Sequence, residues 1–304
     1  MKVGLVMPID DESLGHIPSY RELRDLARQA ESRGLDSIWV FDHLLFRFPD
    51  QPASGIHECW TILAALADAT ERVELGTLVM CTAFRPATLL AKMAAALDVV
   101  SEGRLILGLG TGWHEPEFRA FGYPFAERVG HFQDALAIIT GLLRDGHVDH
   151  HGRYETADDC AMIPRPARRI PILVAAKGPR MLRLAASHAD AWNTAWFGTP
   201  DERLAGRRAD LAAACEAVGR DPATLGVTIG VVVRYPDLMA PDAVPGTVPP
   251  GPSTPALGGS ADEVAAGFRA HAAAGAEHLL VDLQPPTPAA LDRLAQAVEV
   301  FRVA

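Results

Sequence analysis

Short apolar runs alternate with stretches of helical periodicity along the whole chain. The runs are four to eight residues long, rich in β-branched and aliphatic side chains, and most of them are continuously apolar. Continuous apolarity is typical of parallel strands that are buried on both faces. We therefore predict eight strands, at Lys2–Met7, Ser37–Phe41, Val73–Val79, Leu105–Leu109, Ile172–Ala175, Ala191–Thr194, Val227–Arg234 and His278–Leu283.

The segments between these strands carry helix signals. Ser19 and Glu22 have the spacing of a capping box ahead of an apolar stripe, and Gly34 follows where that stripe stops. Ser260 and Glu263 repeat the capping-box spacing near the end of the chain. The chain thus predicts a helix after each strand.

Eight strand–helix units in succession define the fold class. They predict an α/β protein in which residues 1–304 form a single (β/α)8 TIM barrel. A doubly wound open sheet is the alternative, but eight regular units without a switch point favour closure. In a barrel, catalytic residues stand on the loops that follow the strands.

One segment departs from this regular alternation. Residues 235–259, after the seventh predicted strand, are rich in proline and longer than most structureless loops. We interpret the segment as an insertion that acts as a lid over the barrel mouth, because the seventh strand delivers its loop to that face. A mobile surface insertion is the alternative.

Composition narrows the class of partner. The 304 residues carry a formal net charge of −10, which disfavours nucleic acid and anionic membranes as partners. No apolar stretch approaches the ~18 residues of a membrane span, and the N-terminus is typical of a strand rather than a signal peptide. The four cysteines form no C-x-x-C pair, which indicates free thiols in a reducing cytoplasm.

The first candidate chemistry follows the second strand. Asp42 and His43 stand where the apolar segment "WVF" ends. A carboxylate beside an imidazole at a barrel mouth is a candidate general acid–base pair, in which Asp42 would orient His43. The structural alternative is a polar pair that only caps the strand.

The fourth strand ends in the glycine run "GLGTG". Gly108 and Gly110 leave the inner wall of the predicted barrel without side chains at their positions. Trp113 then lies at the mouth, where its ring could pack on a planar ligand. The spacing is not that of a dinucleotide-binding loop. The following "HEPEF" lacks metalloprotease spacing, so we predict no metal site there, and His150–His151 is expected in an exposed turn.

The fifth and sixth strands indicate an anion site. Ala176, Lys177 and Gly178 lead into a helix, and small residues at a helix N-terminus let a phosphate approach backbone amides. Thr194, at the end of the sixth strand, adds a hydroxyl at the same rim. A flat ligand near strands two to four, with its phosphate near strands five and six, fits a flavin better than a sugar.

Three segments carry a resemblance to a known family. They are "ESRGLDSIWVFDHLL", "ERVELGTLVMCTAFRPATLLAKMAAALDVVSEGRLILGLGTGWHEPEFRAFGYPF" and "PILVAAKGPRMLRLAASHADAWNTAW". With them the chain resembles the bacterial luciferase-like flavin-dependent oxidoreductases over nearly its full length. The resemblance implies the same barrel, commonly as a homodimer, with insertion segments at the mouth.

The resemblance also implies residue roles. Asp42 and His43 would lie beside the flavin ring, and Leu78–Val79 matches the site of a non-prolyl cis peptide behind that ring. Gly110 and Trp113 would line the ring pocket. Ala176, Lys177 and Gly178, with Thr194, would hold the phosphate.

Two cofactors remain open within this family. Some members react reduced FMN from a partner reductase with dioxygen, as two-component monooxygenases, and others use the deazaflavin coenzyme F-420 for hydride transfer. The "DHLL" and "GPRMLRLA" segments favour F-420 slightly. The substrate would be a small organic molecule. A flavin-carrying barrel without catalysis and a non-redox barrel enzyme acting on a phosphorylated substrate are the rival classes.

Overall fold

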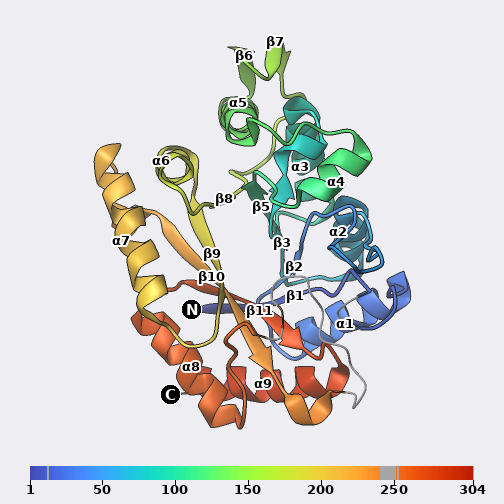
Figure 1. The fold of residues 1–304 in the computed structure, drawn as a ribbon. Helices are drawn as coiled ribbons and strands as arrows, with labels where there is room; N and C mark the ends of the chain where they lie inside the picture. The colour runs from blue at the N-terminus through green and yellow to red at the C-terminus, as the bar shows by residue number, and fades with distance from the viewer. Residues whose placement is uncertain (12–13, 240–250, 252, 304) are drawn as a thin grey trace.

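The computed structural model describes residues 1–11, 14–239, 251 and 253–303, and they form a closed parallel barrel (Figure 1). Going round the barrel, the strands run in the order β3-β2-β1-β11-β10-β9-β8-β5, and pairing of Leu75 with Leu105 joins β3 to β5 and closes it. The barrel strands are β1 (Lys2–Val6), β2 (Ser37–Val40), β3 (Glu74–Thr77), β4 (Met80–Cys81), β5 (Leu105–Gly110), β8 (Ile172–Ala175), β9 (Ala191–Phe197), β10 (Gly226–Arg234) and β11 (His278–Gln284). Closure confirms the predicted barrel and excludes the doubly wound sheet.

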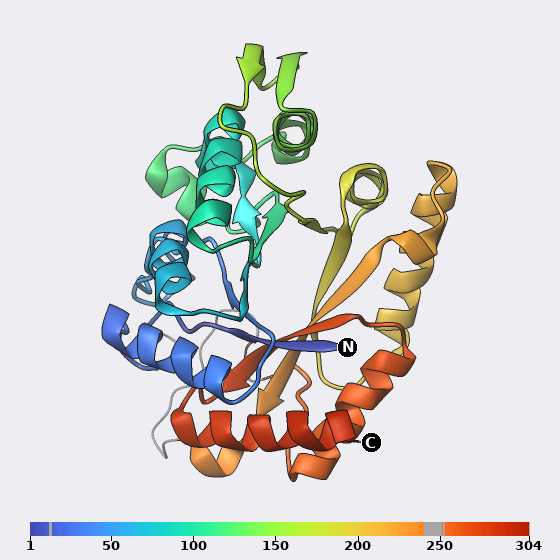
Figure 2. The same ribbon diagram turned by 180° about the vertical axis from the view of Figure 1, so that it is seen from behind.

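Helices surround the barrel, as Figures 1 and 2 show from opposite sides. They are α1 (Tyr20–Ser32), α2 (Cys59–Ala69), α3 (Ala87–Val100), α4 (Glu115–Phe121), α5 (Arg128–Thr140), α6 (Pro179–His188), α7 (Glu202–Ala217), α8 (Ala261–Ala273) and α9 (Pro288–Val303). Short turns are η1 (Thr82–Phe84), η2 (Gly141–Asp145), η3 (Pro222–Thr224) and η4 (Pro236–Leu238). Both capping boxes, at Ser19 and at Ser260, are confirmed.

The third predicted strand, Val73–Val79, is too long. Its counterpart β3 ends at Thr77, and Leu78 and Val79 lie between β3 and β4, joined by a cis peptide bond, as the resemblance implied. A second non-prolyl cis peptide, Ala195–Trp196, lies within β9 and had no counterpart among the predictions.

The prediction of a turn at His150–His151 is also wrong. Both residues belong to β6 (His147–His151), which pairs antiparallel with β7 (Thr156–Ala161). This hairpin extends away from the barrel at the top of Figure 1. The two strands are mostly exposed and polar, so the apolar alternation that marks a strand in a sequence is missing.

Two apolar layers hold the barrel. A large cluster fills the space between the sheet and the helices, and a smaller one lies within the barrel around Val6, Trp39, Leu173 and Leu280. Because side chains alternate along a strand, residues two and four beyond an inward residue also face the interior. This places Phe41 and His43 of the β2 end on the inner side.

About half of the proline-rich segment 235–259, namely residues 240–250 and 252, lies outside the described residues, so its role as a lid stays a prediction. Its last part returns to the barrel, where Leu257 forms a parallel bridge with Val233. Among the described helices, none combines the length and the apolar character needed to cross a membrane.

Candidate functional site

His43 is held by a carboxylate from another element. Its Nδ1 lies 2.8 Å from Oε1 of Glu117 in α4, and Oε2 of Glu117 accepts a hydrogen bond from the Leu44 amide at 2.8 Å. Glu117 is fully buried and the His43 side chain is 13% exposed. Since the carboxylate accepts at Nδ1, the proton sits there and leaves the lone pair of the neutral ring on Nε2. Nε2 makes no hydrogen bond to the described part of the chain.

Asp42 has a different role from the one predicted. Its buried carboxylate accepts from Arg85 Nη1 at 2.7 Å and from the Cys81 amide at 2.9 Å, and no hydrogen bond among the described residues joins it to the His43 ring. Burial raises the pKa of Asp42, while Arg85 opposes that shift. The prediction that Asp42 orients His43 is therefore wrong: Asp42 ties the end of β2 to β4, and Glu117 orients the imidazole.

Aromatic rings surround the imidazole. The His43 ring lies 4.5 Å from the Phe46 ring and 5.5 Å from the Trp113 ring, centroid to centroid. Trp113 is 48% exposed, which leaves one side of its ring open. The neighbouring His114 is buried, accepts from the Arg47 amide through Nε2, and has its pKa lowered by burial, so it is neutral.

The glycine run is part of the barrel wall, as predicted. A Cβ on Gly108 would lie 1.9 Å from the Thr77 carbonyl oxygen, and one on Gly110 would lie 2.5 Å from a Val79 methyl group. The glycines thus let the Leu78–Val79 segment approach β5 closely. This close packing explains why glycines stand at these two positions. It also leaves this part of the wall without side chains from β5.

The predicted anion loop lies at the amino end of α6. Gly178 is the N-cap, no side chain caps the helix, and the position of a Gly178 Cβ has nothing within 4 Å. Ala176 is buried and Lys177 is exposed. Pro179 has no N–H, so the amides of the first α6 turn that can donate here are those of Arg180 and Met181, and open space lies beside them at Gly178.

Two arginines from α7 join this loop. Arg207 donates to the Thr194 hydroxyl and, at 3.1 Å, to the Ala195 carbonyl, and Arg203 donates to the Trp196 carbonyl at 2.7 Å. Although the Lys177 side chain is exposed, partial loss of solvent around its amine lowers the pKa of Lys177, and the charges of Arg207 and Arg203 lower it further. The nearest acidic group to these arginines is Asp201, 3.7 Å from Arg203. The cluster thus holds more positive charge than its neighbours balance.

A carboxyl group stands on the other side of the mouth. Asp282 follows the inward Leu280 by two positions, so it faces the barrel interior, and the Gln284 amide donates to it at 2.6 Å. Burial raises the pKa of Asp282 to about 7, and Asp10, beyond the end of β1, raises it as well. Asp282 is therefore a carboxylic acid over part of the neutral pH range.

Two groups of described residues have metal-ligand spacing. Asp42, Glu58 and Cys59 form one, and Asp149, His151 and Asp158 on the exposed hairpin form the other. In the first group Arg85 already pairs with both carboxylates. A guanidinium at that position competes with a cation.

The chain is similar to several characterised proteins. The F420-dependent hydroxymycolic acid dehydrogenase of Mycobacterium tuberculosis is 35% identical over 207 residues, covering 66% of this chain and 55% of that protein. The pyrimidine monooxygenase RutA of Allorhizobium ampelinum is 27% identical over 255 residues, covering 78% and 68%. An F420-dependent secondary alcohol dehydrogenase, solved with an F420-acetone adduct, has the same fold with a TM-score of 0.80, 18% identity and 99% coverage of both chains.

These similarities define the class of protein. Residues 1–239 match the luciferase-like monooxygenase family, and the chain belongs to that family. The part of this chain that aligns with the first curated relatives spans about half of their length. Family membership confirms the resemblance drawn from the sequence.

Sequence reasoning missed several residues of the mouth. Glu117 stood in "HEPEF", which was compared only with metal-binding spacing; its place directly after a helix-starting proline was the available signal. Arg203 and Arg207 come from α7, and nothing in the sequence connects that helix to the Lys177 loop. Asp282 stood within the predicted last strand, where one acid among apolar residues was the signal.

Proposed function

We propose that this protein is a flavin-type oxidoreductase that uses coenzyme F-420 to transfer a hydride to or from a small organic substrate. One observation carries the proposal: a single barrel mouth combines an imidazole held by a buried glutamate with a cluster of three cations, Lys177, Arg203 and Arg207, which pairs with one acid, Asp201, among the described residues. The first group suits proton transfer, and the second suits a phosphate-bearing cofactor. The F420-dependent relatives support the choice of cofactor.

The loop residues fit the phosphate of such a cofactor. Lys177, Arg203 and Arg207 supply charge, the α6 amides supply donors, and the absence of a Cβ at Gly178 leaves space for an anion. Thr194 is buried, and its hydroxyl accepts from Arg207, so it holds this arginine in place at the loop. The flat wall at Leu78–Val79, next to Gly110, suits a planar ring. Trp113 would border it on the open side.

The cofactor would supply hydride transfer, and the chain would handle the proton. Nε2 of His43 is free to accept a proton from a substrate hydroxyl or to return one. Glu117 holds the ring in this orientation and stabilises the imidazolium once Nε2 is protonated. Asp42 supports the same strand end through Arg85. The aromatic rings around His43 exclude water from this region.

A second candidate is an FMN-dependent monooxygenase. RutA, a pyrimidine monooxygenase, aligns with more of this chain than the F420-dependent relatives do. In that case a reductase would supply reduced FMN, and the same loop would hold the FMN phosphate.

A titration separates the two candidates. Purified protein is titrated with F-420 and with FMN, oxidised and reduced, and binding is followed by fluorescence and absorbance. Tighter binding of F-420 supports the proposal, and tighter binding of reduced FMN with reaction toward oxygen supports the monooxygenase. His43→Ala should retain cofactor affinity and lose turnover. Loss of affinity with normal turnover per bound cofactor would overturn the role of His43.

The proposal of a small organic substrate rests on the apolar residues beside His43. A hollow of about 350 Å³ lies beside the aromatic group, between the loop after β2 and α4, lined by Arg47, Phe48, Pro49, Pro116, Arg119 and Ala120. Together with Phe46 and Trp113 it favours a small organic substrate. We expect the loop after β2 to set its shape.

We also propose that the protein is a homodimer in a reducing cytoplasm. Large apolar side chains are exposed on and beside α3: Leu89, Val99 and Val100 are 50%, 69% and 51% exposed, and Ile163, whose carbonyl accepts from Lys92 of α3, is 75% exposed. Although Lys92 is also exposed there, a surface with this much apolar area suits a self-complementary interface. All four cysteines are free, which fits a reducing compartment.

A further inference from the structure

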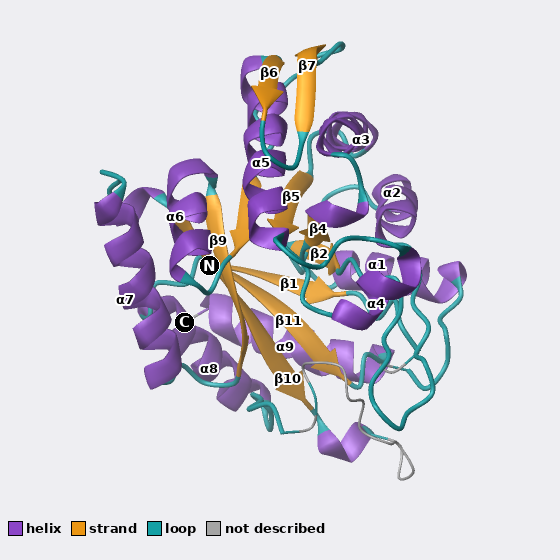
Figure 3. Ribbon diagram, turned by 45° about the horizontal axis from the view of Figure 1, so that its top comes forward, coloured by secondary structure: helices purple, strands orange, loops and turns teal. Residues whose placement is uncertain are grey.

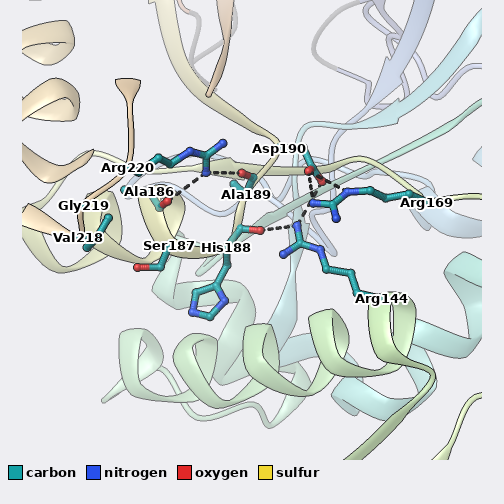
Figure 4. Close-up of a pocket in the computed structure, with 10 residues that line it drawn as sticks. All are labelled: Arg144, Arg169, Ala186, Ser187, His188, Ala189, Asp190, Val218, Gly219 and Arg220. Carbon is teal, nitrogen blue, oxygen red and sulfur yellow. Dashed lines mark hydrogen bonds and ion pairs between the residues drawn. The ribbon is translucent and has the colours of Figure 1, made fainter. Parts of the chain in front are cut away.

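A polar hollow lies at the opposite face of the barrel from the mouth. It has a volume of about 490 Å³ and lies where α6 ends and β8 and β9 begin (Figure 4). We call it the α6 C-terminal hollow. Its lining residues are Arg144, Arg169, Ala186, Ser187, His188, Ala189, Asp190, Val218, Gly219 and Arg220.

Positive charge dominates this hollow. Arg144, Arg169 and Arg220 face a single acid, Asp190. Burial acts to raise the pKa of Asp190, but the Ile172 amide and the two paired arginines outweigh burial and lower it, so the acid is ionised. The lining therefore holds three guanidiniums and one carboxylate, although the chain as a whole has a formal net charge of −10.

Part of this charge stabilises the fold. Arg220 donates through Nη1 to the Ala186 and Ala189 carbonyls at 3.0 and 2.8 Å, and Arg144 donates through Nη2 to the His188 carbonyl at 2.6 Å. Cations at a helix C-terminus satisfy its last carbonyls and its dipole. Arg220 is largely engaged in this way, since its remaining bonds go to Thr224.

The other two arginines keep unused donors. Arg144 Nε is buried and has no hydrogen-bond partner. Arg169 uses Nε and Nη2 on one oxygen of Asp190, at 3.2 and 2.6 Å, and its Nη1 makes no hydrogen bond to the described residues. The Arg169 side chain is 61% exposed, so this nitrogen can donate to a ligand in the hollow. Because Arg144 Nε is closed off from solvent, a ligand would meet that guanidinium at its terminal nitrogens.

We propose that the α6 C-terminal hollow binds a small oxyanion, the phosphate or carboxylate group of a metabolite, through Arg144 and Arg169. Planar guanidiniums recognise both groups by paired hydrogen bonds. The volume lies within the range of small-molecule sites and exceeds the need of a bare ion. Ser187 adds a hydroxyl at the rim. The site requires no cofactor and is separate from the proposed mouth chemistry.

The test is calorimetric titration of the cofactor-free full chain with inorganic phosphate and, in a second arm, with succinate, at constant ionic strength. We expect saturable binding that weakens about tenfold in Arg169→Met and in Arg144→Met, as loss of a charge-assisted hydrogen bond implies. The matched control is Arg183→Met, an exposed arginine of α6 without a described hydrogen bond, which should bind as the wild type does. The arm that binds more tightly identifies the anion class.

Three results would overturn the proposal. One is the absence of saturable binding to either probe. Another is equal binding by the wild type, Arg144→Met and Arg169→Met. The third is binding that disappears in Lys177→Met but persists in Arg169→Met, because the anion would then sit in the mouth. Among the described residues, the Arg169 side chain hydrogen-bonds only to Asp190, so Arg169→Met should melt near the wild-type temperature and tests the site even if Arg144→Met fails to fold.

Discussion

His43 Nδ1 and Glu117 Oε1 lie 2.8 Å apart, although the residues are 74 positions apart in the sequence. The same carboxylate also receives the Leu44 amide. One buried side chain from α4 therefore fixes both the ring and the backbone that follows β2. The contact connects the two segments of the mouth that carry the polar and the aromatic groups.

Replacing this carboxylate should affect stability and turnover together. In Glu117→Gln the amide cannot accept from both His43 and Leu44, so one donor loses its acceptor at a cost of about 1–3 kcal/mol. We expect a lower free energy of unfolding in urea and slower turnover, with cofactor affinity retained. The control is Glu115→Gln on the same helix, which should change stability by less than about 0.5 kcal/mol. Equal effects of the two variants would contradict the role of Glu117.

Lys177 should act on the cofactor phosphate alone. We expect Lys177→Met to weaken FMN binding about tenfold, because a charge-assisted contact is lost. Riboflavin has the same ring without the phosphate, so its affinity should be the same in the variant and the wild type. Fluorescence titration measures both. A parallel loss for riboflavin would show that Lys177 contacts the ring or supports the fold.

The apolar face of α3 should control association. Val100→Glu places a charge where Val100 is 51% exposed in the single chain. If this face is the dimer interface, the variant sediments as a monomer at concentrations where the wild type is a dimer, since an unpaired charge in an apolar interface is costly. Glu216→Gln, an exposed change on α7, serves as a control. A wild-type protein that is monomeric at ~100 µM would contradict the homodimer, given typical affinities of stable dimers.

Two glycines should respond to alanine in opposite directions. Gly108→Ala would place a Cβ 1.9 Å from the Thr77 carbonyl oxygen, which forces the backbone apart and should cost about 1–3 kcal/mol or more. Gly206, within α7, has nothing within 4 Å of its Cβ position, so Gly206→Ala should stabilise the protein by about 0.5–1 kcal/mol. Urea unfolding of both variants measures the contrast. A stabilising Gly108→Ala would show that the wall is looser than the structure indicates.

The sequence predicts the barrel well because its signal is repeated. Eight apolar segments each specify a strand, and the closing β3–β5 pair follows from their number and order. The hairpin of β6 and β7 was not predicted, because a two-stranded ribbon that is mostly exposed needs no apolar alternation. The partners that are distant in the sequence were not predicted for another reason. Asp42 and His43 are neighbours in the chain, but adjacent side chains at a strand end point to opposite sides. Asp42 therefore pairs with Arg85, and His43 pairs with Glu117.

The family resemblance supplied what the pattern could not. The cis peptide at Leu78–Val79 has no local signature, and it was expected only from the similarity of the surrounding segment. Arg203 and Arg207 were not expected beside the Lys177 loop. They belong to α7, which follows β9, and arginines on a helix usually lie on its solvent-exposed face. Spatial clusters built from separate helices require the fold before they can be recognised.

Asp282 should make stability depend on pH in an unusual direction. Its pKa is about 7 in the folded protein, against 3.8 for an ordinary aspartate, so the folded state holds a proton that the unfolded state has lost. Stability is therefore fully present below pH ~4 and falls by up to about 1.4 kcal/mol per pH unit between pH 4 and 7. Asp282→Asn keeps the shape without the titration, so this slope should disappear in urea unfolding measured from pH 4 to 8. Asp68→Asn, an exposed acid of α2, should leave the slope unchanged. An identical slope in the wild type and Asp282→Asn would show that Asp282 is ionised in the folded protein and that the mouth contains no carboxylic acid near neutral pH.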